Sequence, residues 1–87
     1  MTWTVELAAE AERQLERLPE SVLDRVEQAF AVLSADPSKG KALLGDWAGH
    51  RSYRIGQYRV VYTTDAGAGQ VIVRAVAKRG RVYQSRR

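Results

Sequence analysis

The spacing of apolar residues divides the first half of the chain into one strand and two helices. Apolar and polar residues alternate over 2–7, which predicts a half-buried strand. Over 8–18 the apolar residues recur at steps of three and four, which predicts an amphipathic helix that Pro19 ends. A second apolar stripe predicts a helix over Glu20–Ala35, stopped by Asp36-Pro37 because the residue before a proline avoids the helical region.

Strand patterns separated by turn residues fill the second half. Arg51–Ile55 and 58–64 flank Gly56-Gln57, a two-residue turn with glycine where a positive φ can be needed. A glycine-rich loop over 65–69 leads into a third strand at Gln70–Lys78. These segments predict an antiparallel sheet.

The element order β-α-α-β-β-β predicts an α+β fold in a single domain spanning 1–87. It consists of an N-terminal strand, a two-helix hairpin and an antiparallel, twisted sheet of three to four strands. The hairpin covers one face of the sheet and leaves the other only partly covered. Residues 37–50 are expected to connect the two halves, anchored by Leu43, Leu44 and Trp47, and a short segment at 81–83 closes the chain.

The strand at 58–64 predicts which side chains face the helices. Alternate residues face opposite sides of the sheet, so one side receives Tyr58, Val60 and Tyr62 and the other receives Arg59, Val61 and Thr63. Because the first set is the more apolar, we expect it to form the core, which places Arg59 on the open face. A one-residue bulge in this strand would reverse the assignment.

Length and composition exclude several classes of protein. A chain of 87 residues has room for one core. It contains no cysteine, which excludes disulfides, thiolate nucleophiles and cysteine-ligated metals. The longest apolar run, 29–33, is far shorter than the ~18–20 residues of a membrane span, and acidic residues near the N-terminus do not fit a signal peptide. We therefore predict a cytoplasmic protein with no membrane partner.

The net charge of +4 conceals a strong asymmetry. Residues 1–47 carry five basic and nine acidic side chains, whereas residues 48–87 carry nine basic side chains and one acidic one. Eight of those nine cations are arginines, whose forked guanidinium suits phosphate oxygens. The asymmetry fits a polyanionic partner, and it equally fits a charge that keeps a small protein soluble.

Most catalytic sets are missing from the sequence. It has one histidine, no phosphate-binding glycine loop and no cluster of carboxylates for a metal, so we predict neither metal nor cofactor. Four arginines on the predicted strands or their ends could stabilise the charge of a phosphate undergoing attack: Arg51, Arg54, Arg59 and Arg79. Arginine cannot act as a base near neutral pH, which leaves Tyr83 and His50 as candidates to move a proton.

The same residues also fit purely structural roles. Arg54 could be a solvated strand charge, and Arg59 could pair with an acid on the helices. Tyr83 could be a packed terminal aromatic, and His50 an ordinary loop residue.

The run R-I-G-Q-Y-R-V-V-Y over 54–62 resembles the R-x-G-x-Y-R-x-x-Y signature of the RelE/ParE toxin superfamily of bacterial type II toxin–antitoxin systems. Further similarities cover nearly the whole chain, among them the Asp36-Pro37 helix stop and the closing Lys78-Arg79 and Val82-Tyr83 pairs. The resemblance implies a RelE-like fold. For the RelE-like branch it implies an endoribonuclease that cuts mRNA in the ribosomal A site, inhibits translation and is neutralised by a cognate antitoxin.

The resemblance also implies roles for individual residues. The catalytic positions of the family fall on Arg54, Arg59, Arg79 and Tyr83. Two lysines that some RelE members carry before the turn correspond to His50 and Ser52, so Arg51 could supply one missing charge and His50 could exchange a proton. We assign RNA binding to His50, Arg51, Lys78 and Arg81.

Two other functions remain open at this stage. The ParE branch shares the fold, lacks the RNase residues and inhibits DNA gyrase. A non-catalytic basic module that binds RNA or an antitoxin is the third possibility, and loss of the two lysines would fit it. The presence of both Arg79 and Tyr83 favours the RelE-like branch.

Overall fold

A computed structural model describes residues 2–78 of the chain. Two α-helices, two short 3-10 helices and five strands follow one another in this part of the sequence. In chain order they are β1 (Thr4–Leu7), α1 (Ala9–Leu15), α2 (Glu20–Ala35), η1 (Pro37–Lys39), β2 (Lys41–Ala42), η2 (Gly45–Trp47), β3 (Arg51–Ile55), β4 (Tyr58–Asp65) and β5 (Gln70–Lys78).

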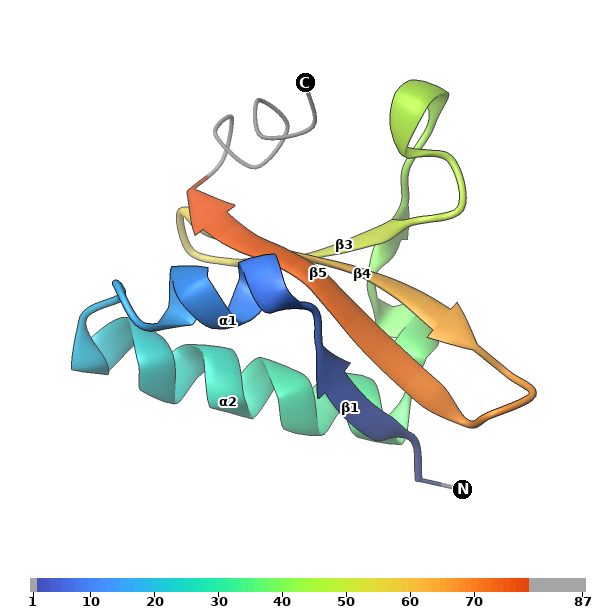
Figure 1. Cartoon of the computed structure of the whole chain (residues 1–87), viewed down its shortest axis with the longest axis horizontal. Helices are drawn as coiled ribbons and strands as arrows, with labels where there is room; N and C mark the ends of the chain where they lie inside the picture. The colour runs from blue at the N-terminus through green and yellow to red at the C-terminus, as the bar shows by residue number, and fades with distance from the viewer. Residues whose placement is uncertain (1, 79–87) are drawn as a thin grey trace.

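The strands form one twisted sheet in the order β1-β5-β4-β3-β2 (Figure 1). The pairs β2–β3, β3–β4 and β4–β5 are antiparallel, and β1 lies parallel to β5 at one edge. The α+β fold predicted from the sequence is therefore confirmed. The strand number is higher than expected because β2, with two residues, is too short to show a period-two pattern.

Both helices pack on the same face of the sheet, with α1 along β5 (Figure 1). The core between the layers is built from aliphatic side chains and one tyrosine of the helices and of β4 and β5: Ala11, Val26, Leu33, Val60, Tyr62, Val71, Val73 and Val76. Tyr62 and Val60 belong to this core, as the alternation in β4 predicted. The opposite face is the open face that carries Arg59.

A register shift between Val61 and Tyr62 marks a β-bulge in the β4–β5 pair. Val61 pairs with Ala75 and Tyr62 pairs with Val73, so the extra residue is Arg74 on β5. The bulge reverses the side-chain alternation within β5 and leaves that of β4 intact. For that reason the predicted orientation of Arg59 holds.

Two local predictions were wrong. Helix α1 ends at Leu15 rather than beside Pro19, because the chain tightens into turns that bond Arg17 N–H to the Gln14 carbonyl and Leu18 N–H to the Leu15 carbonyl. Leu44 does not anchor the connecting segment and is 87% exposed. Leu43 and Trp47 do anchor it, since both pack on the open face of the sheet against Val61 and Ala75.

Candidate nucleic-acid interface

Two arginines stand side by side on the open face of the sheet. Arg54 on β3 pairs directly with Arg59 on β4, next to the Gly56-Gln57 turn. Side chains at directly opposed positions have Cβ atoms about 4.5–5.5 Å apart, and like charges placed there destabilise a sheet. An anion bound beside both guanidinium groups would offset this repulsion.

Arg59 is held in place from one side. Its Nη1 donates a hydrogen bond of 3.3 Å to the Oγ of Ser52, a buried serine two residues before Arg54 on β3. Its Nε is buried and has no hydrogen-bond partner in the part of the chain that the structure describes. The guanidinium of Arg54 is exposed, and its Nε donates to the carbonyl of Gly56 at 3.1 Å.

Arg54 and Arg59 form one side of a shallow hollow of about 450 Å³. The described residues that line it are Lys39, Lys41, Ser52, Tyr53, Arg54 and Arg59. Four of these six side chains are cations and none is an acid. A concave surface with one sign of charge concentrates its field and attracts polyanions. We call these six residues the basic hollow.

Lys39 and Lys41 were missed in the sequence analysis. They lie in 37–50, which the sequence predicts to be a connection, and they reach the hollow because Lys41 pairs with Ser52 across β2 and β3. No period-two signal marks them in the sequence, because Lys39 belongs to the 3-10 helix η1 and β2 has only two residues.

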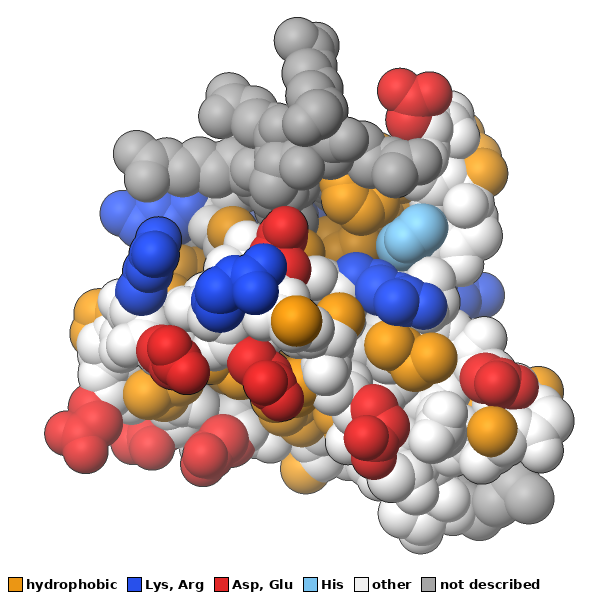
Figure 2. All heavy atoms as spheres, viewed as in Figure 1, with side chains coloured by type: hydrophobic (Ala, Val, Ile, Leu, Met, Phe, Trp, Pro, Cys, Tyr) orange, Lys and Arg blue, Asp and Glu red, His pale blue; other side chains and the backbone are white. Residues whose placement is uncertain are grey.

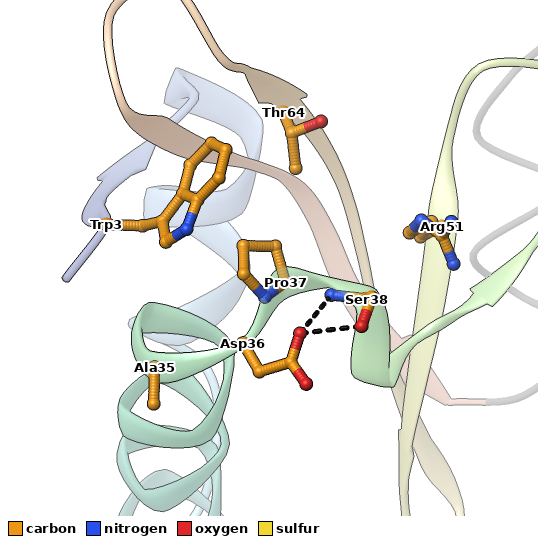
Figure 3. Close-up of a pocket in the computed structure, with 7 residues that line it drawn as sticks. All are labelled: Trp3, Ala35, Asp36, Pro37, Ser38, Arg51 and Thr64. Atoms are coloured by element: carbon orange, nitrogen blue, oxygen red, sulfur yellow. Dashed lines mark hydrogen bonds between the residues drawn. The ribbon is translucent and has the colours of Figure 1, made fainter. Parts of the chain in front are cut away.

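The predicted RNA-binding residue Arg51 does not lie with Arg54 and Arg59. Arg51 precedes Ser52 on β3 and points to the helix side of the sheet, where its Nη1 donates to the Gly40 carbonyl at 2.7 Å. There it borders a separate cavity of about 500 Å³ at the end of α2, drawn in Figure 3. That cavity also contains an indole, a proline and a carboxylate: Trp3, Pro37 and Asp36.

His50 and Lys78 are also placed outside the basic hollow. The imidazole of His50 packs edge to face on Trp47, with ring centroids 5.1 Å apart, and its buried Nδ1 has no hydrogen-bond partner among the described residues. Lys78 pairs with Tyr58 at the end of β5 and lies near Arg17 on the helix side. The predicted site residues Arg79, Arg81 and Tyr83 lie outside the described residues, and their roles stay predictions.

In the view of Figure 2 most of the acidic side chains lie along the lower part of the molecule, where the helices are, and the lysines and arginines lie above most of them. Within residues 2–78 no group of three or more His, Asp or Glu side chains is arranged to hold a metal ion. None of the helices in that range has the length and apolar character needed to cross a membrane.

The carboxylate of Asp36 fixes the segment that leads to the hollow. It accepts hydrogen bonds from the Ser38 hydroxyl at 2.6 Å and the Ser38 backbone N–H at 3.0 Å, capping η1 (Figure 3). These bonds lower the pKa of the Asp36 carboxyl below its ordinary value. A lowered folded-state pKa stabilises the fold above the unfolded pKa, and the contribution disappears as the pH falls through the folded value.

We therefore expect Asp36→Asn to remove one source of acid sensitivity. The difference in free energy of unfolding between the natural protein and Asp36→Asn should be constant at neutral pH and should shrink below about pH 4. Urea unfolding between about pH 3 and pH 7 measures it. A difference that does not change with pH would contradict the assigned role of the carboxylate.

Comparison with known proteins identifies relatives over most of the chain. Residues 5–83 match the family described as the ParE toxin of type II toxin–antitoxin systems. The chain is 40% identical over 82 residues to Toxin RelE of Mycobacterium tuberculosis, covering 92% of this chain and 84% of that protein. It is 37% identical over 86 residues to Toxin RelG of the same organism, covering 97% of this chain and 99% of that protein.

Solved structures resemble the fold closely. The crystal structure of the toxin–antitoxin complex RelBE2 from M. tuberculosis matches with a TM-score of 0.84 and 37% identity, covering 91% of this chain and 93% of the matched one. A free-state structure of the E. coli toxin RelE carrying two arginine substitutions matches with a TM-score of 0.78 at 18% identity, covering 97% of this chain and 93% of the matched one. The latter likeness is one of fold alone.

Proposed function

The chain belongs to the ParE toxin family of type II toxin–antitoxin systems and is a toxin of the RelE type, and from this premise we propose that it is a metal-independent endoribonuclease. Its substrate is mRNA, cut at the ribosomal A site, so that its action in the cytoplasm inhibits translation. The observation that carries the proposal is the basic hollow, with Arg54 and Arg59 opposed on the open face.

RNA cleavage of this kind needs charge stabilisation and two proton transfers. The 2′-hydroxyl oxygen attacks the adjacent phosphorus and loses its proton to a base. The bond from phosphorus to the 5′-oxygen breaks, and that oxygen takes up a proton. The products are a 2′,3′-cyclic phosphate and a 5′-hydroxyl end. Negative charge accumulates on the phosphoryl oxygens during attack, so several preorganised cations around them lower the barrier.

The hollow provides cations suited to this charge. Arg59, oriented by Ser52, presents a planar fork that matches two phosphoryl oxygens, and the exposed Arg54 can approach the same group. Neither arginine can serve as the base. The proton transfers are assigned to Tyr83, in keeping with the family resemblance, and a further cationic contact to Arg79. His50 packs against Trp47 and is not among the described residues that line the hollow, so we assign no proton transfer to it.

An antitoxin is the proposed protein partner. The chain's relatives include the toxin of the M. tuberculosis RelBE2 toxin–antitoxin complex, and structures of E. coli and archaeal RelE with RelB share its fold. The basic open face favours an antitoxin with acidic or amphipathic segments, bound in a groove or along a strand edge. Ribosome and mRNA are the remaining proposed partners, recognised through phosphate.

Mapping the 5′-ends of cellular mRNA after induction tests the proposed activity. We expect growth and translation to stop, new ends to appear in phase with codons, and co-expression of the cognate antitoxin to reverse both effects. Double-strand DNA breaks with intact mRNA would instead support a ParE-like gyrase inhibitor. If both mRNA and DNA stay intact, the result would support a non-catalytic basic module that binds RNA or an antitoxin.

A further inference from the structure

Two lysines enter the basic hollow from a segment far from the arginines in sequence. Lys39 ends η1 and Lys41 begins β2, and both side chains are exposed and line the hollow together with Arg54 and Arg59. The residue between them, Gly40, is buried. The two lysines thus stand on either side of a buried glycine, which suggests that the backbone here is fixed to the sheet below.

Tyr62 supplies that attachment. Its hydroxyl, fully buried in the core, accepts a hydrogen bond of 2.9 Å from the Gly40 N–H and donates one to the Pro37 carbonyl. Arg51 adds a third bond by donating to the Gly40 carbonyl at 2.7 Å. A Cβ atom at Gly40 would lie 2.3 Å from the Tyr62 hydroxyl oxygen, so only glycine allows this close approach.

The fastened segment adds two cations to the hollow. Each ammonium has three donors and a compact charge, and the four cations share a space of about 450 Å³ without an acid among the described lining residues. Placing like charges close together opposes folding. The three hydrogen bonds to the backbone of Pro37 and Gly40 hold the lysine-bearing segment in place against this repulsion. An extended anion lying in the hollow could contact the lysines as well as the arginines.

We propose that Lys39 and Lys41 bind the RNA backbone in the same hollow as Arg54 and Arg59, and that the bonds of Tyr62 to Pro37 and Gly40 position them. This inference rests on the proposed function for the identity of the ligand, a single-stranded RNA phosphodiester chain. The lysines grip the phosphates, and the arginines act on the linkage that is cut.

A competing explanation comes from the position of β2 at the edge of the sheet. An exposed lysine on an edge strand, here Lys41, prevents pairing with the edge of another molecule. Under that explanation, removing the charge of Lys41 would promote self-association and leave RNA binding unchanged.

The test compares Lys39→Gln and Lys41→Gln with Arg13→Gln, which removes one exposed charge from α1 on the other side of the sheet. The probe is a short single-stranded RNA, with affinity measured at several salt concentrations. We expect each lysine variant to bind more weakly at low salt and to flatten the slope of log K against log salt by about 0.7. Lys41→Arg should retain the slope, and Arg13→Gln should match the natural protein.

Cleavage on ribosomes separates this inference from the proposed function. If the natural protein cuts mRNA, the lysine variants should raise KM more than they lower kcat. If the natural protein cuts mRNA and both lysine variants keep its KM and its salt slope, the inference about the lysines is overturned and the proposed function stands. A natural protein that does not cut mRNA, while the lysine variants still flatten the salt slope, overturns the proposed function and leaves the binding role of the lysines supported.

Discussion

Replacing Arg59 by alanine is expected to slow RNA cleavage about 10²–10³-fold, equivalent to ~2.7–4 kcal/mol, the usual cost of removing one preorganised contact to a transition state. The physical reason is the position of its guanidinium, oriented by Ser52 and opposed to Arg54 on the open face. Single-turnover cleavage of mRNA on purified ribosomes measures the effect.

Stability provides the control for this variant. Among the described residues, the hydrogen bond that Arg59→Ala removes is the one to Ser52, typically worth about 0.5–1.5 kcal/mol, so the variant should remain folded. Arg59→Lys retains the charge without the fork and should recover only part of the rate. A fully active, folded Arg59→Ala protein would show that Arg59 takes no part in the reaction. An equal loss of cleavage rate in Arg13→Ala would show that only the net charge of the protein matters.

Tyr62→Phe is expected to lower the free energy of unfolding by about 1–3 kcal/mol, because it leaves the buried Gly40 N–H without its partner. In a domain of this size the melting temperature should fall by about 4–8 °C for each kcal/mol. The ring remains, so the packing of the core is preserved. Thermal unfolding beside Tyr58→Phe, a half-buried tyrosine on the same face of β4, isolates the contribution of the hydroxyl.

The same variant should change the response to alkaline pH. Burial raises the pKa of the Tyr62 hydroxyl above its ordinary value of 10.0. A raised folded-state pKa means that the stabilisation is complete below the unfolded value and is lost as the pH rises through the folded value. The destabilisation caused by Tyr62→Phe should therefore diminish above about pH 10. A destabilisation that grows with pH would contradict this assignment.

Local patterns determined most of the fold. The structure places α2, β3 and β5 at the predicted residues, because a proline-bounded apolar stripe and strands bounded by glycine turns are signals contained in the segments themselves. The open-face position of Arg59 followed from alternation, and it held because the bulge falls at Arg74 on the neighbouring strand.

The rest depends on contacts between distant segments. Strand β2 exists through its pairing with β3, so two residues of sequence could not reveal it, and Lys39 and Lys41 stayed hidden with it. Arg51 seemed equivalent to Arg54 in a list of charges. However, Arg51 and Arg54 lie an odd number of residues apart on β3, so their side chains face opposite sides of the sheet. That of Arg51 lies on the helix side, where it donates a hydrogen bond to the Gly40 carbonyl. Charge counts predict a class of partner, and only the register of the sheet shows which charges meet.

The salt dependence of RNA binding by the double variant Arg54→Gln/Arg59→Gln tests the central claim most directly. If the two arginines of the basic hollow grip an RNA backbone, their removal should flatten the slope of log K against log salt by about 1.4, which is 0.7 for each lost phosphate contact. Arg13→Gln/Arg17→Gln, an equal loss of charge on α1 and the turn after it, should leave the slope close to that of the natural protein. Equal slopes for the natural protein and Arg54→Gln/Arg59→Gln would contradict the account.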